Sequence, residues 1–326
     1  MKLFTKLKQL FAENQIMVVL LGIVLGLLFP AIFKPLSPYT TQLLILIFFC
    51  SSLRLELKEI IIYIKDWKML ALVNSSMLIF LPLLMWLPLT LYAPDWAMAF
   101  LIIGAMPTGM TIALIADLFG GKTTLALVIT ATTSLLAPLT IPFVFWIAIG
   151  RIVPVPVVSL FTNLFITIVL PFIVATYVKQ KRPKFVVKYD FWWREISIIA
   201  FGILIATIVA DTVGSEGMIT LSFRDAGLVA VMLIYMSALV AITYFMSYWR
   251  SHAEKATIAL CIVYLNNTLS LYIANKFFPD ARLMTQLVIL LLVINFLLPP
   301  FRWIAAHAVM LDNKQVKKKN RKHIKR

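Results

Sequence analysis

The sequence contains few charged residues for its length. Only 13% of its 326 residues are charged and 62% are hydrophobic, whereas a soluble domain is about a quarter charged and about half apolar. The charges fall in clusters, and the segments between them are apolar for about 20 residues, the length of a helix that crosses a bilayer. These segments do not alternate with polar residues, which disfavours an outer-membrane barrel. The composition therefore predicts an all-α polytopic membrane protein.

Residues that carry catalysis or hold metals are also scarce. The two cysteines, Cys50 and Cys261, fall within apolar segments, so no disulfide framework is implied. The three histidines lack the spacing of metal ligands, and no nucleophile–base set, phosphate-binding loop or pair of catalytic carboxylates occurs. We therefore expect no enzyme activity, no metal site and no cofactor. The basic run at 317–322 lacks aromatic interleaving, so we expect it to meet anionic lipid and not nucleic acid.

Charges and turn residues divide the chain into ten apolar segments. The second segment is short and ends in the polar run Cys50-Ser51-Ser52, so nine spans is the alternative count. The ten predicted spans are 16–33, 40–53, 69–92, 97–118, 124–149, 155–177, 196–212, 226–248, 256–275 and 284–305.

The basic residues predict the orientation of these spans. With the N-terminus inside, 25 of the 30 basic residues fall on the cytoplasmic side. Such a bias is typical of cytoplasmic loops, and it favours an even number of spans, because nine would place one basic terminus outside. We expect a multi-pass protein of the cell (inner) membrane with both termini cytoplasmic. Five basic residues lie outside in this arrangement: Lys34, Arg151, Arg224, Lys276 and Arg282.

Two spans are interrupted in the middle by residues that do not suit a lipid-facing helix. The fourth contains Gly104-Ala105-Met106-Pro107-Thr108-Gly109, and the ninth contains Leu265-Asn266-Asn267-Thr268-Leu269-Ser270. Because each half has five spans, the second half enters the membrane from the opposite side, as in the inverted repeats of secondary transporters. We therefore predict a first repeat at 1–150, a second at 151–310 and a basic cytoplasmic tail at 311–326.

The two interruptions place polar groups at membrane depth. Pro107 removes a backbone donor, and the half-helix that begins near Thr108 would direct its positive end at the break, which suits an anionic group. The alternative is a proline kink filled by neighbouring hydroxyls. Asn266 and Asn267 place two amides at membrane depth, where polar groups are costly and normally face the bundle interior. Their alternative role is hydrogen bonding between helices.

The stretch GAMPTGMTIALIADLFGGKTTLALVITATTSLLAPLTIP, from Gly104 to Pro142, resembles the fourth and fifth helices of the bile acid:sodium symporter family. Asn267 also matches the asparagine of that family's Glu-x-Gly-x-Gln-Asn break. The resemblance implies a core of spans 3–5 and 8–10 around two crossed discontinuous helices, spans 4 and 9. It also implies a panel of spans 1, 2, 6 and 7, with substrate bound between panel and core. The matching or similar positions are Thr130, Thr133, Ser134, Leu135, Leu136, Ala137, Pro138 and Pro142.

The family's sodium ligands are mostly replaced. Its Ser-Asn pair on the fourth helix is Ile112-Ala113 here, its first serine on the fifth helix is Ala126, and its Glu on the ninth helix is Ile262. Thr130 is retained, and Asn266 stands in place of the Gln. Because Na⁺ requires several oxygen ligands, we do not expect a family-type sodium site. The ion coupling is then changed or lost, and H⁺ is the other coupling ion.

The leading interpretation is a secondary active transporter that moves a small organic anion by alternating access. One alternative is an arsenite-efflux-like permease, the family's second branch, but Thr108 replaces that branch's Cys and Leu269 replaces its Glu. The other alternative is a non-transporting receptor or sensor on the same fold. The sequence does not indicate an oligomeric state.

We take polar and break residues inside the spans as candidates for the site. Asp117 and Asp211 are candidate coupling residues, because burial would raise the pKa of either carboxyl, although both also suit helix ends. The candidates for binding substrate or ion are Pro107, Thr108, Gly109, Thr111, Thr130, Ser134, Asn266, Asn267, Thr268, Asn74, Ser75 and Asn295.

Overall fold

The computed structural model describes residues 15–55, 63, 65–109, 112, 116, 121–216 and 223–294. Apart from one isolated β-bridge, every element within these ranges is helical. The apolar stretch Ala281–Ile294 is also helical. The elements are α2 (Gln15–Leu28), α3 (Pro30–Phe33), η1 (Lys34–Tyr39), α4 (Thr40–Ser52), α6 (Trp67–Ser75), η2 (Ser76–Phe80), α7 (Leu81–Tyr92), α8 (Pro94–Gly104), α10 (Thr123–Ile149), α11 (Val157–Leu164), η3 (Phe165–Val169), α12 (Leu170–Lys181), α13 (Pro183–Lys188), α14 (Asp190–Glu216), α15 (Phe223–Met246), α16 (His252–Val263) and α17 (Asn267–Phe277).

Helix length and composition confirm the prediction of an all-α polytopic membrane protein. Within the described ranges, 6 helical segments are long and apolar enough to cross a bilayer. The count of ten spans and the inverted repeat stay predictions, because parts of the fourth and tenth predicted spans lie outside the described residues. The six segments are Pro30–Ser52, Trp67–Tyr92, Thr123–Ile149, Val157–Lys181, Asp190–Thr212 and Val229–Met246.

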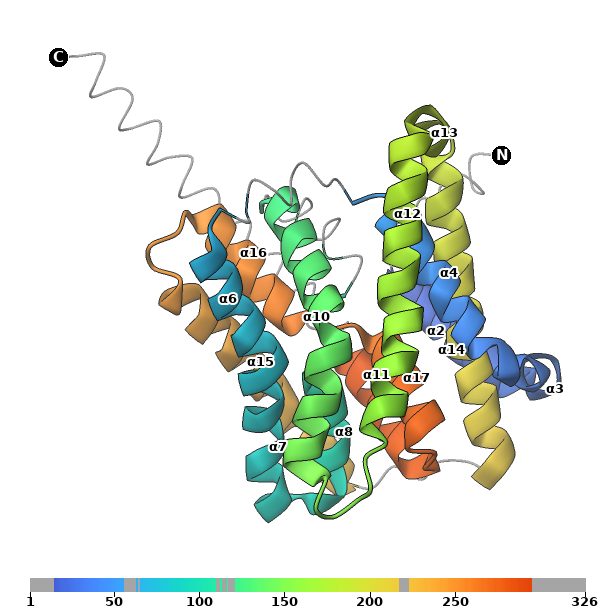
Figure 1. Ribbon diagram of the computed structural model, residues 1–326. Coiled ribbons are helices and arrows are strands. Elements are labelled where there is room, and N and C mark those ends of the chain that lie inside the picture. The colour runs from blue at the N-terminus through green and yellow to red at the C-terminus, as the bar shows by residue number, and fades with distance from the viewer. Residues whose placement is uncertain are drawn as a thin grey trace, which may run out of the picture.

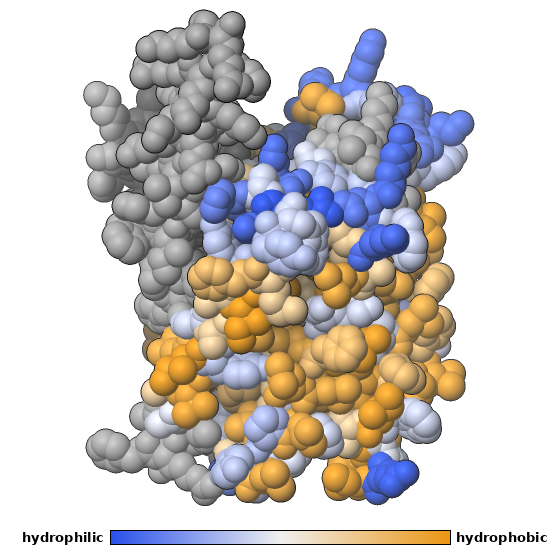
Figure 2. Space-filling view, turned by 90° about the vertical axis from the view of Figure 1, so that its left-hand side faces the viewer, coloured by the Kyte–Doolittle hydropathy of each residue, from blue (hydrophilic) through white to orange (hydrophobic). Residues whose placement is uncertain are grey.

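The outer surface has the polarity of a membrane protein. Figure 2 shows the left-hand face of Figure 1 as a broad hydrophobic band, with hydrophilic residues gathered mainly at one end. This is the end at which α13 lies and at which α6 and α16 begin (Figure 1). Ion pairs occur beyond the band on both sides. Arg250 pairs with Asp66 at this end, and Arg282 pairs with Asp95 at the other end at 3.1 Å.

The helices form two groups that lie side by side (Figure 1). In one group, α7 packs on α8, α15 packs on α16, and α10 contacts α6, α7 and α16. In the other group, α14 packs on α2, α3 and α4, and α12 packs on α4 and α13. Helices α11 and α17 lie between the groups, and α17 contacts α8 on one side and α4 and α14 on the other.

Two of the long segments widen in the middle. The π-helical turns η2 and η3 lie just before Pro82 and Pro171. Proline has no N–H to donate to the preceding turn, so the local hydrogen bonding shifts and the helix widens. Both segments continue as α-helix beyond the proline, so each remains long enough to cross the membrane.

Small residues allow α2 to approach α14 closely. A Cβ added at Gly22 would lie 2.9 Å from the carbonyl oxygen of Gly202, and one added at Gly26 would lie 2.5 Å from that of Ala206. Gly22 and Gly26 have the four-residue spacing that brings helix backbones together in membranes. Any larger side chain at Gly26 must push the two backbones apart.

We therefore predict that Gly26→Ala destabilises the protein by about 1–3 kcal/mol, the usual cost of overpacking. Gly227→Ala on α15 is the matched control, because a Cβ there has no atom within 4 Å. Thermal unfolding of the purified protein in detergent measures both variants. Equal midpoints for the two variants would contradict the close α2–α14 contact.

Candidate functional site

The two interrupted helices cross, and their backbones pair at the crossing. After α8 ends, Thr108 forms an antiparallel β-bridge with Leu265, which lies between α16 and α17. The N–H of Gly109 donates to the carbonyl of Tyr264 at 2.7 Å, and the N–H of Asn266 donates to the carbonyl of Pro107 at 2.8 Å. Non-helical backbone at membrane depth is tolerated only where its polar groups are satisfied inside the protein. This pairing meets that requirement for both breaks.

Gly109 is required at the crossing because the other chain passes so close. A Cβ at this position would lie 2.7 Å from the ring of Tyr264. That ring is almost fully buried, with 2% of the residue exposed, so it has little room to move. The interruption predicted at Pro107 and Gly109 is therefore a close backbone contact between two segments and not a simple kink.

Thr108 joins three elements. Its N–H donates to the hydroxyl of Thr133 on α10 at 3.4 Å, and its own hydroxyl donates to the carbonyl of Cys261 on α16 at 3.2 Å. The side chain is fully buried. The two bonds connect the first break to α10 and α16, and the Thr108 hydroxyl is used in this contact.

Three other polar side chains at or next to the crossing have unused hydrogen-bonding capacity. They are Ser134, Asn266 and Asn267, of which 8%, 4% and 8% of the surface is exposed. The Ser134 hydroxyl, the Asn266 Nδ2 and the Asn267 Oδ1 have no hydrogen-bond partner among the described residues. A buried polar atom without a partner is costly, so such atoms indicate a place that a water, an ion or a ligand occupies. All three residues were predicted as site residues.

Asn266 serves two purposes with the two ends of its amide. Its Oδ1 accepts from the N–H of Leu269 at 3.1 Å and so caps the N-terminus of α17. Its Nδ2 stays free of described partners beside the positive end of the helix dipole. Donors and a positive dipole end together favour a negatively charged or electron-rich group at this point.

Comparison with known proteins gives a match to one protein family. The model of the Sodium Bile acid symporter family matches residues 41–222, which is more than half of the chain. The chain belongs to the sodium bile acid symporter family. This confirms the resemblance found in the sequence, and membership of a transporter family indicates that the chain is not an enzyme. The matched range contains the first break but not the second.

The chain also has a distant bacterial relative. The chain is similar to the "Uncharacterized sodium-dependent transporter YocS" of Bacillus subtilis (strain 168), with 27% identity over 191 residues. That match covers 57% of this chain and 59% of the relative. The chain therefore matches less than two thirds of the length of that relative.

Three of the positions that the resemblance assigns to sodium ligands carry buried aliphatic side chains here, and a fourth, Ala113, lies outside the described residues. Ile112 and Ala126 are fully buried, and Ile262 is 7% exposed. The retained Thr130 hydroxyl donates to the carbonyl of Ala126 in its own helix at 2.8 Å. The oxygens that remain near the crossing in the described part of the chain belong to hydroxyls, amides and the backbone, and all are neutral.

Several other predicted site residues have different surroundings. Asn74 bonds to the carbonyl of Leu70 at 2.7 Å through Nδ2 and accepts from the hydroxyl of Thr132 on α10 at 3.2 Å. Both ends of its amide are thus engaged in joining α6 to α10. Ser75 is half-buried, and Thr268 is buried at the start of α17. Three further candidates lie outside the described residues: Thr111, Asp117 and Asn295.

Asp211 lies in the other helix group. Its carboxylate accepts from the hydroxyl of Ser37 at 2.9 Å, which connects α14 to η1. The carboxylate therefore joins α14 to η1 within the helix group around α14, which corresponds to the panel that the family resemblance implies. Among the described residues, it is not part of the crossing.

Sequence reasoning missed a polar cluster at the far end of α17. The ammonium of Lys276 donates to the Asn163 Oδ1 at 2.6 Å, to the Tyr272 hydroxyl at 3.1 Å and to the Thr41 hydroxyl at 3.2 Å. The spacing of Tyr272 and Lys276 by four residues predicts that they share a helix face. Nothing in the sequence indicates that Thr41 and Asn163 face them.

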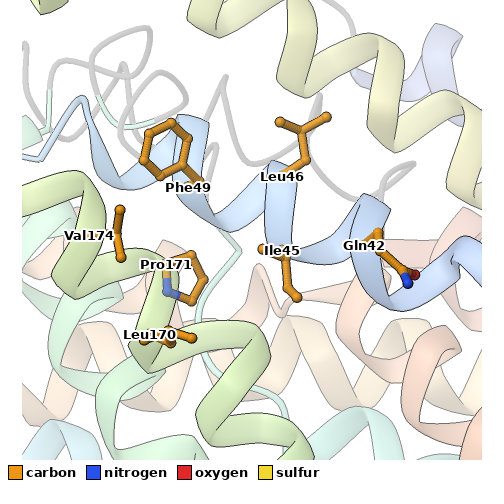
Figure 3. A pocket seen from close by; sticks show the side chains of 7 residues that line it. All are labelled: Gln42, Ile45, Leu46, Phe49, Leu170, Pro171 and Val174. Carbon is orange, nitrogen blue, oxygen red and sulfur yellow. The ribbon is translucent and has the colours of Figure 1, made fainter. Parts of the chain in front are cut away.

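The structure also contains an apolar groove that none of the predicted site residues lines. It has a volume of about 270 Å³ and lies between α4 and α12, as Figure 3 shows. Gln42 supplies the only polar side chain of its lining, so the groove suits a lipid chain better than an anionic group. The lining residues are Gln42, Ile45, Leu46, Phe49, Leu170, Pro171 and Val174.

The capping role of Asn266 gives a stability prediction. Asn266→Ala removes the acceptor for the N–H of Leu269 and should lower the free energy of unfolding by about 1 kcal/mol. Asn266→Ser keeps a capping oxygen and should unfold close to the wild-type temperature. Thermal unfolding in detergent tests this, and equal loss of stability in both variants would contradict the capping role.

Proposed function

We propose that the protein is a secondary active transporter that moves a small organic anion across the membrane by alternating access. The observation that carries this proposal is the crossing itself. Two interrupted helices pair their backbones there, while the Ser134 hydroxyl, the Asn266 Nδ2 and the Asn267 Oδ1 remain buried without a described partner. Such a place at membrane depth is the usual position of a substrate or ion site in secondary transporters.

The choice of an anion follows from the donors. Asn266 Nδ2 lies at the positive end of α17, and the described residues add no carboxylate at the crossing that would repel a negative group. The family name points in the same direction, because bile acids are organic anions and sodium is the cation that accompanies them. The described part of the chain thus presents donors and a helix N-terminus to a ligand.

The arrangement of helices supports alternating access. The group that contains the crossing and the group around α14 meet along α11 and α17 (Figure 1). Each group has its own internal packing, so one can rock against the other as a body around a fixed site. The first group corresponds to the proposed core of spans 3–5 and 8–10, and the second to the proposed panel of spans 1, 2, 6 and 7.

We further propose that the family-type sodium site is degenerate in this chain. Buried aliphatic side chains at Ile112, Ala126 and Ile262 offer no ligand oxygen. Coupling to Na⁺ is then weak or replaced by coupling to H⁺. Asp211, one of the two candidate residues for proton coupling, bonds to Ser37 between α14 and η1 and so lies outside the crossing. The basic residues at one end of the molecule favour a cytoplasmic position of that end.

One structural observation, a buried cysteine at the crossing, bears on the alternative of an arsenite permease. Cys261 is fully buried, and its carbonyl accepts from Thr108 at the crossing. A trivalent arsenic centre favours several soft thiolate ligands. No group of three or more His, Cys, Asp or Glu residues able to hold a metal ion occurs in the described ranges, so a single buried thiol gives this alternative little support.

The transport proposal predicts loss of uptake when the free amide donor is removed. Asn266→Ser keeps the cap of α17 but lacks Nδ2, and we expect initial uptake in proteoliposomes to fall about tenfold or more, the effect of losing a hydrogen bond to a charged group. Radiolabelled cholate and a series of small carboxylates are the probes. Pro107→Ala, which changes the break itself, should also lose uptake while the protein still inserts.

Thr140→Val is the matched control for these variants. Thr140 is on α10 and only half-buried, and its hydroxyl bonds to the carbonyl of Leu136 in its own helix. We expect wild-type uptake from this variant. Normal transport by both Asn266→Ser and Pro107→Ala would overturn the proposed site, and failure of wild-type protein to exchange any carboxylate would favour a receptor or sensor.

The degenerate sodium site predicts weak sodium dependence. Uptake is measured with a sodium gradient, a proton gradient or neither, in vesicles of one preparation. Because most family ligand positions lack oxygen, we expect the sodium gradient to raise the initial rate by less than about twofold. A strong sodium stimulation would contradict the proposed loss of ligands at Ile112, Ala126 and Ile262.

A further inference from the structure

The polar cluster around Lys276 joins the two helix groups. Its residues come from three helices: Thr41 from α4, Asn163 from α11, and Tyr272 with Lys276 from α17. The Thr41 and Tyr272 hydroxyls also lie 3.1 Å apart, so Thr41 and Tyr272 each contact two members of this set, Lys276 contacts three, and Asn163 contacts Lys276. Figure 1 shows α17 and α11 lying between the two groups. The cluster is therefore built across the boundary along which the groups would move.

The positive charge of the cluster has no acidic partner among the described residues. The ammonium of Lys276 bonds to three neutral oxygens and lies 5.4 Å from the centre of the Tyr272 ring. No described Asp or Glu lies within ion-pair distance of it. Hydrogen bonds and the ring face orient the ammonium but do not neutralise it. Its charge is available to a ligand.

The groups in the cluster suit an oxyanion. An ammonium has three donors, and a threonine or tyrosine hydroxyl can donate or accept. Lys276 is exposed, so a ligand can reach it, whereas Tyr272 is 1% exposed and provides a fixed wall. A bond from the ammonium to an ionised carboxylate, sulfonate or phosphate oxygen joins two opposite charges, and it is stronger than the bonds that the ammonium now makes to neutral oxygens. An arriving oxyanion can therefore replace Thr41 and Asn163 as the ammonium's partner.

The position of the cluster relates it to the crossing. Lys276 is near the end of α17, and Asn267 begins the same helix at the crossing, about 14 Å away at 1.5 Å per residue. The cluster is toward the end of the molecule at which the α10–α11 connection lies (Figure 1). One helix thus carries donor groups for a negative ligand at both of its ends.

We propose that Lys276, Tyr272 and Thr41 form a binding site for the oxyanion group of an organic anion at the boundary between the two helix groups. This inference rests on the proposed function in taking the substrate to be an anion, and it adds a residue that recognises the charge. Binding draws the ammonium away from Thr41 and Asn163. It therefore weakens the contacts of α17 with α4 and α11, which links occupancy of the site to movement of the groups.

Equilibrium binding to the purified full-length protein in detergent tests the site. The probes are cholate, a steroid monocarboxylate, and its uncharged methyl ester. We expect wild-type protein to bind cholate more tightly than the ester, and Lys276→Gln to weaken cholate binding about tenfold while leaving ester binding unchanged. Lys276→Arg should retain the preference for cholate. Tyr272→Phe, which keeps the ring and removes one donor, should show a smaller loss.

Arg151→Gln is the matched control. It removes one positive charge from an exposed position in the α10–α11 connection, at the same end of the molecule but outside the set of side chains that Lys276 contacts. We expect this variant to bind both probes as the wild type does, which separates a local contact from a general effect of net charge. Equal loss in Arg151→Gln and Lys276→Gln would overturn the site, as would an unchanged preference for cholate in Lys276→Gln. Absence of cholate binding to the wild type would overturn it as well.

The binding experiment and the transport experiment fail in different ways. Binding requires no movement of the two groups, so charge-selective binding that depends on Lys276 supports the site even if no uptake occurs. Conversely, if Lys276→Gln takes up cholate with unchanged KM and rate, the oxyanion site is wrong and the transport proposal stands.

Discussion

Pairing of backbone polar groups at the helix crossing is the constraint on which the rest of the structure depends. Lipid offers no hydrogen bonds, so a chain that leaves the helical path inside the membrane must find its partners within the protein. The bonds of Gly109 with Tyr264 and of Asn266 with Pro107 supply them between two segments far apart in the sequence. Each break is stable only because the other is present.

The pairing also determines which groups remain for a ligand. Backbone atoms at the crossing bond to one another, and the hydroxyl of Thr108 is engaged with the carbonyl of Cys261. The unused capacity belongs to Ser134, Asn266 and Asn267, side chains next to these bonds. Because the crossing is held by backbone bonds and Thr108, the side chains of Ser134, Asn266 and Asn267 would be able to change partners in the proposed transport cycle without opening the crossing. Such a separation of holding groups from binding groups suits a site that must repeatedly fill and empty.

The sequence predicted the general fold and both breaks, but it separated site residues from packing residues less well. Apolar length and charge clusters are local properties, and Pro107, Gly109 and Asn266 are residue types that lipid-facing helices disfavour, so they could be recognised from the chain alone. Asn74 is an asparagine inside a predicted span, as Asn266 is, so the sequence alone does not distinguish their roles. In the structure its amide joins α6 to α10, because Thr132 lies beside it. Lys276 was read as an orientation marker because its partners come from distant helices.

The neutral character of the crossing connects the coupling ion to the substrate. A cation bound among hydroxyl and amide oxygens alone carries its full charge into a low-dielectric interior, which is unfavourable without a negative partner. In the described part of the chain that partner is absent, since the buried Ile262 stands where the resemblance places the family's Glu. The negative charge would then have to come from the substrate. A sodium ion could bind strongly here only together with an anion, and a neutral substrate would leave it without a partner. If the proposed site at the N-terminus of α17 is correct, the charge of the substrate and the presence of ion coupling are therefore linked in this protein.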